Sequence, residues 1–162
     1  MEIVNEIRLA ARGKGRVGAW FDLDGVVVAI DAFVSHAEFR AMDMSHNREI
    51  KTMTKILRKL HASGVRVGIL GLAFTDAHAD QKMAWVRRVL PFVAPDDIVL
   101  IKSHAHPEIA PADKITLKPT YLAPRIHDGE VTYFVDDTSE CLTAMLSALP
   151  SVHCVHVSAF LK

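Results

Sequence analysis

The chain has 162 residues, and its 19 basic and 19 acidic residues cancel to a formal net charge of zero. Half of the residues are hydrophobic, which excludes a disordered chain and suffices for one domain to bury a core without metal or disulfide staples. A chain without net charge has no overall positive field that would attract nucleic acid or an anionic membrane. No apolar run is long enough to span a membrane, the N-terminus lacks a signal-peptide pattern, and the two cysteines indicate a reduced, cytoplasmic protein.

Short apolar runs alternate with segments of helical periodicity, without internal repeats or long linkers. A strand followed by a helix, repeated four or five times, indicates a mostly parallel sheet with both faces covered. We therefore expect a single doubly wound, three-layer α/β/α domain over residues 1–162, with no sizeable cap. In chain order the expected elements are a helix at 3–12, a strand at 16–21, an apolar run at 26–30, a helix at 47–62, a strand at 65–72, a helix at 80–90, a strand at 98–101, a loop with a possible short helix at 103–128, a strand at 131–135, a helix at 139–149 and a strand at 152–157.

The spacing of apolar residues predicts which face of each helix is buried. In the helix at 139–149 the residues expected to point inward are Leu142, Met145, Leu146 and Leu149. In the helix at 47–62 they are Ile50, Met53, Ile56, Leu57 and Leu60.

Carboxylate pairs follow two of the expected strands. Asp22 and Asp24 come directly after the strand at 16–21, and Asp136 and Asp137 after the strand at 131–135. Ligands of parallel sheets bind outside the carboxyl ends of the strands, so all four side chains are expected at one edge. Four converging carboxylates repel one another and favour a divalent cation; all-oxygen ligands favour Mg²⁺, which in turn recruits phosphate oxygens.

Each pair also has a purely structural interpretation. An Asp-x-Asp sequence is common in turns, and the run from Asp136 to Ser139 has the composition of a helix N-cap. The combination favours a functional site, because both pairs end apolar strands and Gly25 follows the first pair.

The sequence from Phe21 to Val26, Phe-Asp-Leu-Asp-Gly-Val, resembles the first motif of the haloacid dehalogenase superfamily, and Phe134 to Asp137, Phe-Val-Asp-Asp, resembles its fourth. The resemblance covers nearly the whole chain. It implies that Asp22 is the nucleophile of an aspartyl-phosphate mechanism and Asp24 the general acid and base. It also implies that Asp22, the backbone carbonyl of Asp24, Asp136 and Asp137 form the Mg²⁺ site.

The superfamily places a lysine between these motifs to balance charge on the phosphoryl group. Lys114 is our first candidate for this catalytic lysine, and Lys102 and Lys118 compete with it.

The second motif departs from the superfamily pattern, in which the second strand ends with Thr or Ser. Gly71 stands at that position and has no hydroxyl group. We expect Gly71 and the backbone N–H of Leu72 to contact the phosphoryl group, with Thr75 as a substitute hydroxyl. Loss of one such contact typically costs about 10²–10³ in rate.

Residues 31–46 form an insert too short for a full cap domain. The segment from Thr75 to Pro91, which contains Lys-Met-Ala-Trp-Val at 82–86, is similar to the stretch after the second motif in deoxyribonucleotidases and polynucleotide 3′-phosphatases. The polynucleotide enzymes usually carry an Arg shortly after the second motif, where this chain has Ala73. His104 and His106 lie at the expected ligand edge and are candidates for substrate contact. We expect a small phosphorylated substrate of nucleotide-like or other organic type, since the neutral charge disfavours a nucleic-acid end and a membrane.

Three functions compete. The first is a Mg²⁺-dependent phosphomonoester hydrolase, and the second is a catalytically weak binding or regulatory module that keeps the metal site, as Gly71 suggests. The third, a phospho-receiver domain, is disfavoured because its acidic pair ends the first strand and its phosphoacceptor a middle strand, whereas here the second acidic pair comes late. The sequence does not determine the oligomeric state.

Overall fold

Five parallel strands form the centre of the structure, in the order β3-β2-β1-β4-β5. The computed structural model describes residues 2–13, 15–30, 38 and 43–161. The expected three-layer, doubly wound α/β architecture is confirmed. The strands are β1 (Arg16–Phe21), β2 (Arg66–Ala73), β3 (Ile98–Lys102), β4 (Glu130–Asp136) and β5 (His153–His156).

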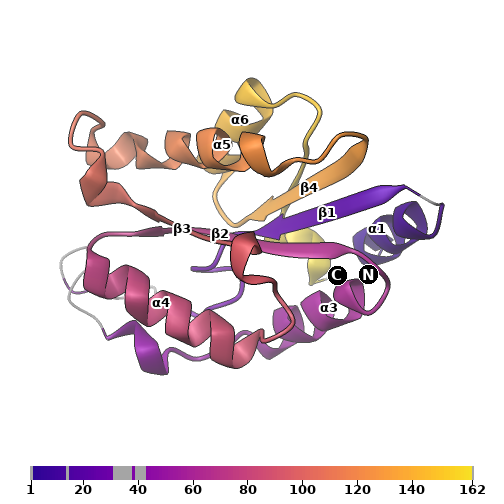
Figure 1. Cartoon of the computed structure of the whole chain (residues 1–162), viewed down its shortest axis with the longest axis horizontal. Coiled ribbons are helices and arrows are strands. Elements are labelled where there is room, and N and C mark those ends of the chain that lie inside the picture. Colours follow the sequence, from indigo (N-terminus) through magenta and orange to yellow (C-terminus); the bar gives the residue numbers. More distant parts are fainter. Residues whose placement is uncertain (1, 14, 31–37, 39–42, 162) are drawn as a thin grey trace.

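Helices cover both faces of the sheet (Figure 1). One face carries α1 (Glu2–Arg12), α3 (Lys51–His61) and α4 (Asp76–Val89), and the other carries α5 (Leu117–Leu122) and α6 (Ser139–Ala148). Successive strand residues point to opposite faces, so β1 contributes to two cores. Phe21 packs with α1, α3 and α4 residues, whereas Trp20 packs with residues of α5 and α6.

Helix α3 begins later than the apolar spacing predicts, because residues 47–50 are engaged with neighbouring segments. The amide of Ile50 donates to the carbonyl of Val27 at 2.8 Å, and Val28 forms an isolated bridge with Glu49. The apolar run at 26–30 is thus a turn with isolated bridges rather than a strand. Within α3 the expected inward face is confirmed, since Met53, Ile56, Leu57 and Leu60 are buried.

Helix α4 begins four residues before the expected start, at Asp76. Thr75 is its N-cap, and its side chain accepts a hydrogen bond from the amide of His78 at 3.1 Å. An N-cap of this kind stabilises a helix by about 1 kcal/mol. The cap therefore extends α4 to the end of β2, next to the carboxyl edge of the sheet.

The inward face expected for α6 is wrong at Leu146, which is 51% exposed. Cys141 and Met145, one helical turn apart, are the buried residues of this helix. Leu146 follows Met145 directly and is therefore rotated by about 100° from the buried stripe.

Within the described residues, no cap domain covers the carboxyl edge of the sheet. Most of the expected insert at 31–46 lies outside the described residues, and its described end contains a short 3-10 helix, Met44–His46. A search of the described residues for a membrane-spanning helix found none of sufficient length and apolarity.

Candidate active site

Three carboxylates from two adjacent strands meet at the carboxyl edge of the sheet. Asp22 directly follows β1, and its amide donates to the carbonyl of Val135 in β4 at 2.8 Å, which extends the pairing of the two strands by one residue. Oxygen atoms of Asp22, Asp136 and Asp137 all lie within 4.8 Å of one another. One member of the first pair, Asp22, therefore converges with both members of the second pair.

The lysine at these carboxylates is Lys118. Its Nζ lies 2.8 Å from Asp22 Oδ1 and 2.7 Å from Asp136 Oδ2, and its side chain is only 4% exposed. The first candidate, Lys114, instead donates to the backbone carbonyl of His106, and Lys102 pairs with Asp76 at 2.5 Å. Lys114 belongs to a 3-10 segment, Pro111–Thr116, that precedes α5. Lys118 lies in the first turn of α5, next to the carboxylates.

Charge at this edge remains incompletely balanced. Three carboxylates face one ammonium group, which leaves an excess of two negative charges when all are ionised. Burial raises the pKa of Asp22 to about 7, and the charges of Asp136 and Asp24 act in the same direction, against Lys118. Burial together with the charge of Asp136 also raises the pKa of Asp137. A divalent cation with oxygen ligands supplies the missing charge, so the donor set fits Mg²⁺.

Asp136 is held in its ionised form by direct contacts. Burial works to raise its pKa, but Lys118 and Thr138 outweigh burial and hold the pKa below its ordinary value. Thr138 donates to Asp136 Oδ1 from its amide at 2.9 Å and from its hydroxyl at 2.6 Å. Thr138 makes no side-chain cap bond to α6, so here its hydroxyl orients a carboxylate rather than capping the helix.

Asp24 lies apart from the three-carboxylate cluster and pairs with a different lysine. Its Oδ2 contacts Nζ of Lys82, a residue of α4 whose side chain is 1% exposed. The same Nζ donates to the carbonyl of Leu72 at 2.6 Å. Asp24 is positioned by the turn that follows it, where Gly25 has a φ of 77° that favours glycine. Lys82 thus connects the end of β2 to the candidate acid and base.

Sequence reasoning missed the role of Lys82, although a signal for it was present. The buried residues of α4 include Ala79, Lys82 and Val86, which share one helical face. A lysine in such an apolar register is rarely buried without a partner. The pattern therefore indicates a buried ion pair, while its partner, Asp24, is 58 residues away and emerges only in three dimensions.

Gly71 lies beside Asp22, as its place in the second motif predicts. A Cβ atom built on Gly71 comes within 3.8 Å of Asp22 Oδ1 and 3.2 Å of the Cβ of Leu23. A Cβ atom at this position would require Leu23 to shift by a few tenths of an ångström. Leu72, the other expected phosphate contact, accepts the hydrogen bond from Lys82 through its carbonyl, and Thr75 is occupied as the N-cap of α4.

The histidines expected at the ligand edge differ in their surroundings. His104 is exposed and lies 3.4 Å from Asp76, whereas His106 is half-buried and contacts the hydroxyl of Tyr121 at 2.9 Å. Neither contacts the three-carboxylate cluster.

Comparisons with known proteins bear on the fold alone. The sequence matches no protein-family model and no curated protein at a significant level. Among solved structures, a chain of the Pnkp1/Rnl/Hen1 complex aligns with 88% of this chain at a TM-score of 0.65 and 12% identity. The chain has a haloacid dehalogenase-like fold. This alignment includes 46% of the matched chain, so the protein spans less than half the length of that relative.

A second solved structure matches with a lower similarity score. The N-terminal part of BF1531 from Bacteroides fragilis, which contains a phosphatase domain complexed with Mg, aligns with 93% of this chain and 39% of its own. Its identity is 19% and its TM-score 0.49, so the assignment of the haloacid dehalogenase-like fold depends on the first match.

Proposed function

We propose that the protein is a Mg²⁺-dependent phosphomonoester hydrolase that forms an aspartyl-phosphate on Asp22. The observation that carries the proposal is the contact of one buried lysine, Lys118, with both Asp22 and Asp136. A lysine so placed fixes the nucleophile and balances charge on a phosphoryl group above it. The haloacid dehalogenase-like fold supports the proposal, because it brings the two carboxylate pairs to the ligand edge of the sheet.

Asp22, Asp136, Asp137 and the backbone carbonyl of Asp24 would hold Mg²⁺ in this proposal. When bound, the ion would polarise the phosphoryl oxygens and neutralise the excess negative charge described above. Ionised Asp22 is the form that both binds the ion and attacks phosphorus, so binding is expected to overcome the raised pKa of Asp22.

The reaction then proceeds in two steps carried by the aspartates. A carboxylate oxygen of Asp22 forms a bond to phosphorus while the bond to the leaving oxygen breaks, and Asp24 gives that oxygen a proton. In the second step Asp24 takes a proton from water, the water oxygen attacks phosphorus, and inorganic phosphate leaves with Asp22 restored. Lys82 holds the side chain of Asp24 on the β2 side of the site.

Gly71 and the backbone N–H of Leu72 are proposed to line the phosphoryl pocket. With no hydroxyl at Gly71, one contact to the phosphoryl oxygens is missing, which lowers the expected rate by roughly 10²–10³ relative to a complete site. The same glycine supports the second candidate function, a binding or regulatory module that keeps the metal site and has little turnover.

The substrate class proposed is a nucleotide-like or other small organic phosphate. The matched chain belongs to the Pnkp1/Rnl/Hen1 complex, which makes a nucleic-acid end a further substrate to test. The formal net charge of zero argues against it, because grooves that follow a phosphate backbone need an excess of Lys and Arg.

The decisive experiment measures phosphate release from an aryl phosphate, a nucleotide panel and 3′-phosphorylated oligonucleotides, with Mg²⁺ and with a chelator. Asp22→Asn is expected to reduce turnover by roughly 10³-fold or more, because it removes the nucleophile. Asp96→Asn, at an exposed aspartate outside the site, is the matched control.

Turnover that survives both chelation and Asp22→Asn would contradict the mechanism. Mg²⁺ binding by the wild-type protein without release of phosphate from any substrate would instead support the binding module.

A further inference from the structure

A second feature of the carboxyl edge is a cavity of about 370 Å³ beyond the ends of β2 and β3. Its apolar wall is formed by Phe74, Pro107, Ile109 and Pro111. Polar groups of Ser103, His104 and Lys114 lie among its lining residues. None of these residues belongs to the three-carboxylate cluster.

The cavity lies on the same side of the sheet edge as the carboxylates. Phe21 pairs with Ile69, so Asp22 is level with Leu70, and Phe74 follows four residues later along the chain. Strand β2 ends at Ala73, so at about 3.3 Å per residue its end stands roughly 10 Å beyond the level of the nucleophile, and Phe74 of the cavity wall follows directly. Lys114 lines the cavity and Lys118, one helical turn later, contacts Asp22, so one segment borders both places.

We propose that this cavity binds a planar aromatic ring, of nucleobase type, that is joined to the phosphate hydrolysed at Asp22. The inference rests on the proposed function and specifies its substrate class. An aromatic ring of this kind needs apolar surfaces against its faces and hydrogen-bonding groups at its edge, and the cavity offers both.

Phe74 is the residue to which the ring stacks. Its own ring is already supported from within the protein, because it stacks on buried His78 with centroids 5.8 Å apart and an interplanar angle of 24°. A ring fixed in this way loses little conformational entropy when a ligand packs against it.

The charges around the cavity favour a single aromatic group over a polymer. Lys102 and His104 both face Asp76, at 2.5 Å and 3.4 Å, and the buried Nζ of Lys114 donates to a backbone carbonyl. The charges of Lys102 and His104 thus face one carboxylate, whereas Lys114 keeps its charge and two further N–H donors for a ligand. Among the described cavity residues, no line of unpaired cations follows a phosphate backbone.

The test compares aromatic with aliphatic phosphates. Kinetics with Mg²⁺ are measured on adenosine and thymidine 5′-monophosphates and on glycerol 3-phosphate. The ratio of kcat/KM for the nucleotides to that for glycerol 3-phosphate is expected to fall about tenfold or more in Phe74→Ala, because stacking on an aromatic side chain is lost. Phe74→Leu keeps most of the apolar volume and is expected to lower the same ratio.

Phe92→Ala is the matched control, since Phe92 packs against His61 outside the cavity, and it is expected to leave the ratio unchanged. Binding of adenosine 5′-monophosphate to Asp22→Asn with Mg²⁺, measured by calorimetry, provides a readout that needs no turnover. Phe74→Ala in this background is expected to weaken binding about tenfold.

The outcomes separate the two proposals. Hydrolysis with no preference for the nucleotides, or an equal effect of the Phe74 variants on all substrates, overturns the aromatic site and leaves the hydrolase. Absence of hydrolysis together with Phe74-dependent binding of the nucleotide overturns the hydrolase and retains the aromatic site. Absence of both overturns both.

Discussion

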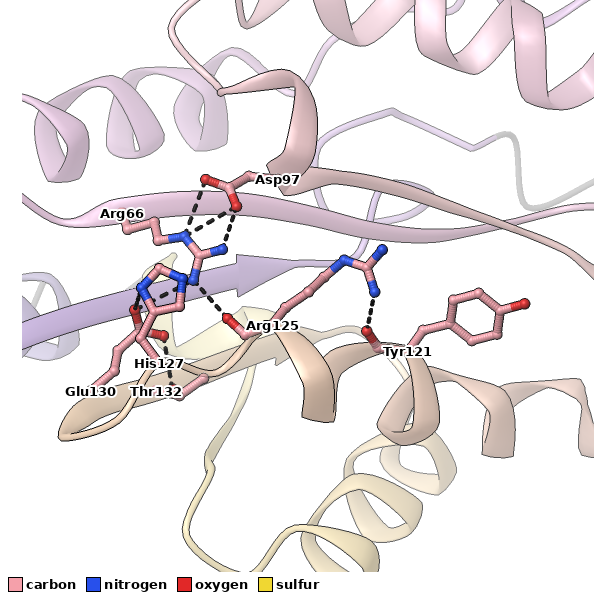
Figure 2. Close-up of polar contacts among 7 residues, drawn as sticks. All are labelled: Arg66, Asp97, Tyr121, Arg125, His127, Glu130 and Thr132. Atoms are coloured by element: carbon pink, nitrogen blue, oxygen red, sulfur yellow. Dashed lines mark hydrogen bonds and ion pairs between the residues drawn. The ribbon is translucent and has the colours of Figure 1, made fainter.

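Two charged clusters, one partly exposed and one buried, lie at opposite ends of the same sheet, and they differ in how completely their charges are satisfied. At the amino end, Arg66 forms the centre of a cluster that connects β2, the segment before β3 and the start of β4 (Figure 2). Its guanidinium lies 2.5 Å from Asp97 and 3.4 Å from Glu130, and donates to the carbonyl of Arg125 at 2.7 Å. At the carboxyl end, Lys118 faces three carboxylates.

The guanidinium at the amino end distributes its donors over two carboxylates and a carbonyl. Burial works to lower the pKa of Arg66, but Asp97 and Glu130 outweigh it and raise the pKa. Thr132 also donates to Glu130, at 3.2 Å. At the other end burial holds the pKa of Asp22 at about 7 despite Lys118. Buried charge that the protein satisfies by itself is structural, whereas buried charge left in excess indicates a site for an external cation.

The strongest test of this comparison is to remove the lysine at the carboxyl end. Lys118→Met is expected to lower kcat/KM at least about 100-fold, because Asp22 and the phosphoryl group lose their charge partner. The loss of kcat/KM in Lys114→Met is expected to be at least about tenfold smaller than in Lys118→Met, since Lys114 contacts a backbone carbonyl rather than the carboxylates. Steady-state kinetics on one aryl phosphate measure both variants, with Lys55→Met on exposed α3 surface as control. Equal losses of kcat/KM in the two variants would support a catalytic role for Lys114.

Removal of the arginine at the amino end is expected to affect stability rather than chemistry. Arg66→Met removes the cation shared by Asp97 and Glu130, while His127 stays 3.8 Å from Glu130, and is expected to cost about 1–3 kcal/mol in the free energy of unfolding. Turnover of the folded fraction is expected to stay near that of the wild type. Denaturant melts and kinetics at low temperature measure the two effects, and Arg87→Met, at an exposed residue, is expected to stay within about 0.5 kcal/mol. A large loss of turnover in folded Arg66→Met would show that the two ends are coupled.

The smallest of the three effects is a pH dependence of the metal-free protein. Folded Asp22 keeps its proton up to about pH 7, whereas the unfolded chain releases it near pH 4, so this group makes the metal-free protein less stable as pH rises between those values. Asp137, with a raised pKa, acts in the same direction. Burial lowers the pKa of His78, which makes stability rise with pH near neutrality and opposes this effect.

The difference between wild type and Asp22→Asn isolates the contribution of Asp22. We expect the melting temperature of chelated wild type, relative to Asp22→Asn, to be lower at pH 8 than at pH 5.5. Mg²⁺ is expected to raise the wild-type melting temperature more at pH 8, because the ion binds the carboxylate form. A stabilisation by Mg²⁺ that is equal at both pH values, or equal in Asp22→Asn, would argue against a metal site at Asp22.

The sequence predicts the sheet better than it predicts the site's cations. The strand expected at 16–21 is confirmed at both ends, and the other main strands are confirmed within one or two residues, because apolar runs ended by Gly, Pro or Asp mark buried parallel strands clearly. The convergence of Asp22 with Asp136 was also predictable, because both lie at the carboxyl ends of parallel strands.

The cations could not be predicted in the same way. Lys118 lies after 3-10 turns at 103–105 and 111–116, where no periodicity reveals which lysine faces the sheet. Lys82 is separated from Asp24 by 58 residues, and its pairing depends on how far α4 extends toward the carboxyl edge, which the cap at Thr75 determines. The position of a side chain that reaches the site from a helix thus depends on tertiary packing. The position of one at a strand end follows from the local sequence pattern.

The central position of β1, with β2 on one side and β4 on the other, also affects how the protein is made. The ribosome completes the strand that ends at Asp136 more than a hundred residues after Asp22. Until β4 joins β1, a nascent chain has neither Lys118 nor Asp136 beside Asp22 and has an unpaired strand edge. Such non-local pairing is slow and exposes the chain to aggregation. Under the proposed function, capacity to bind the ion is expected only after β4 has paired with β1.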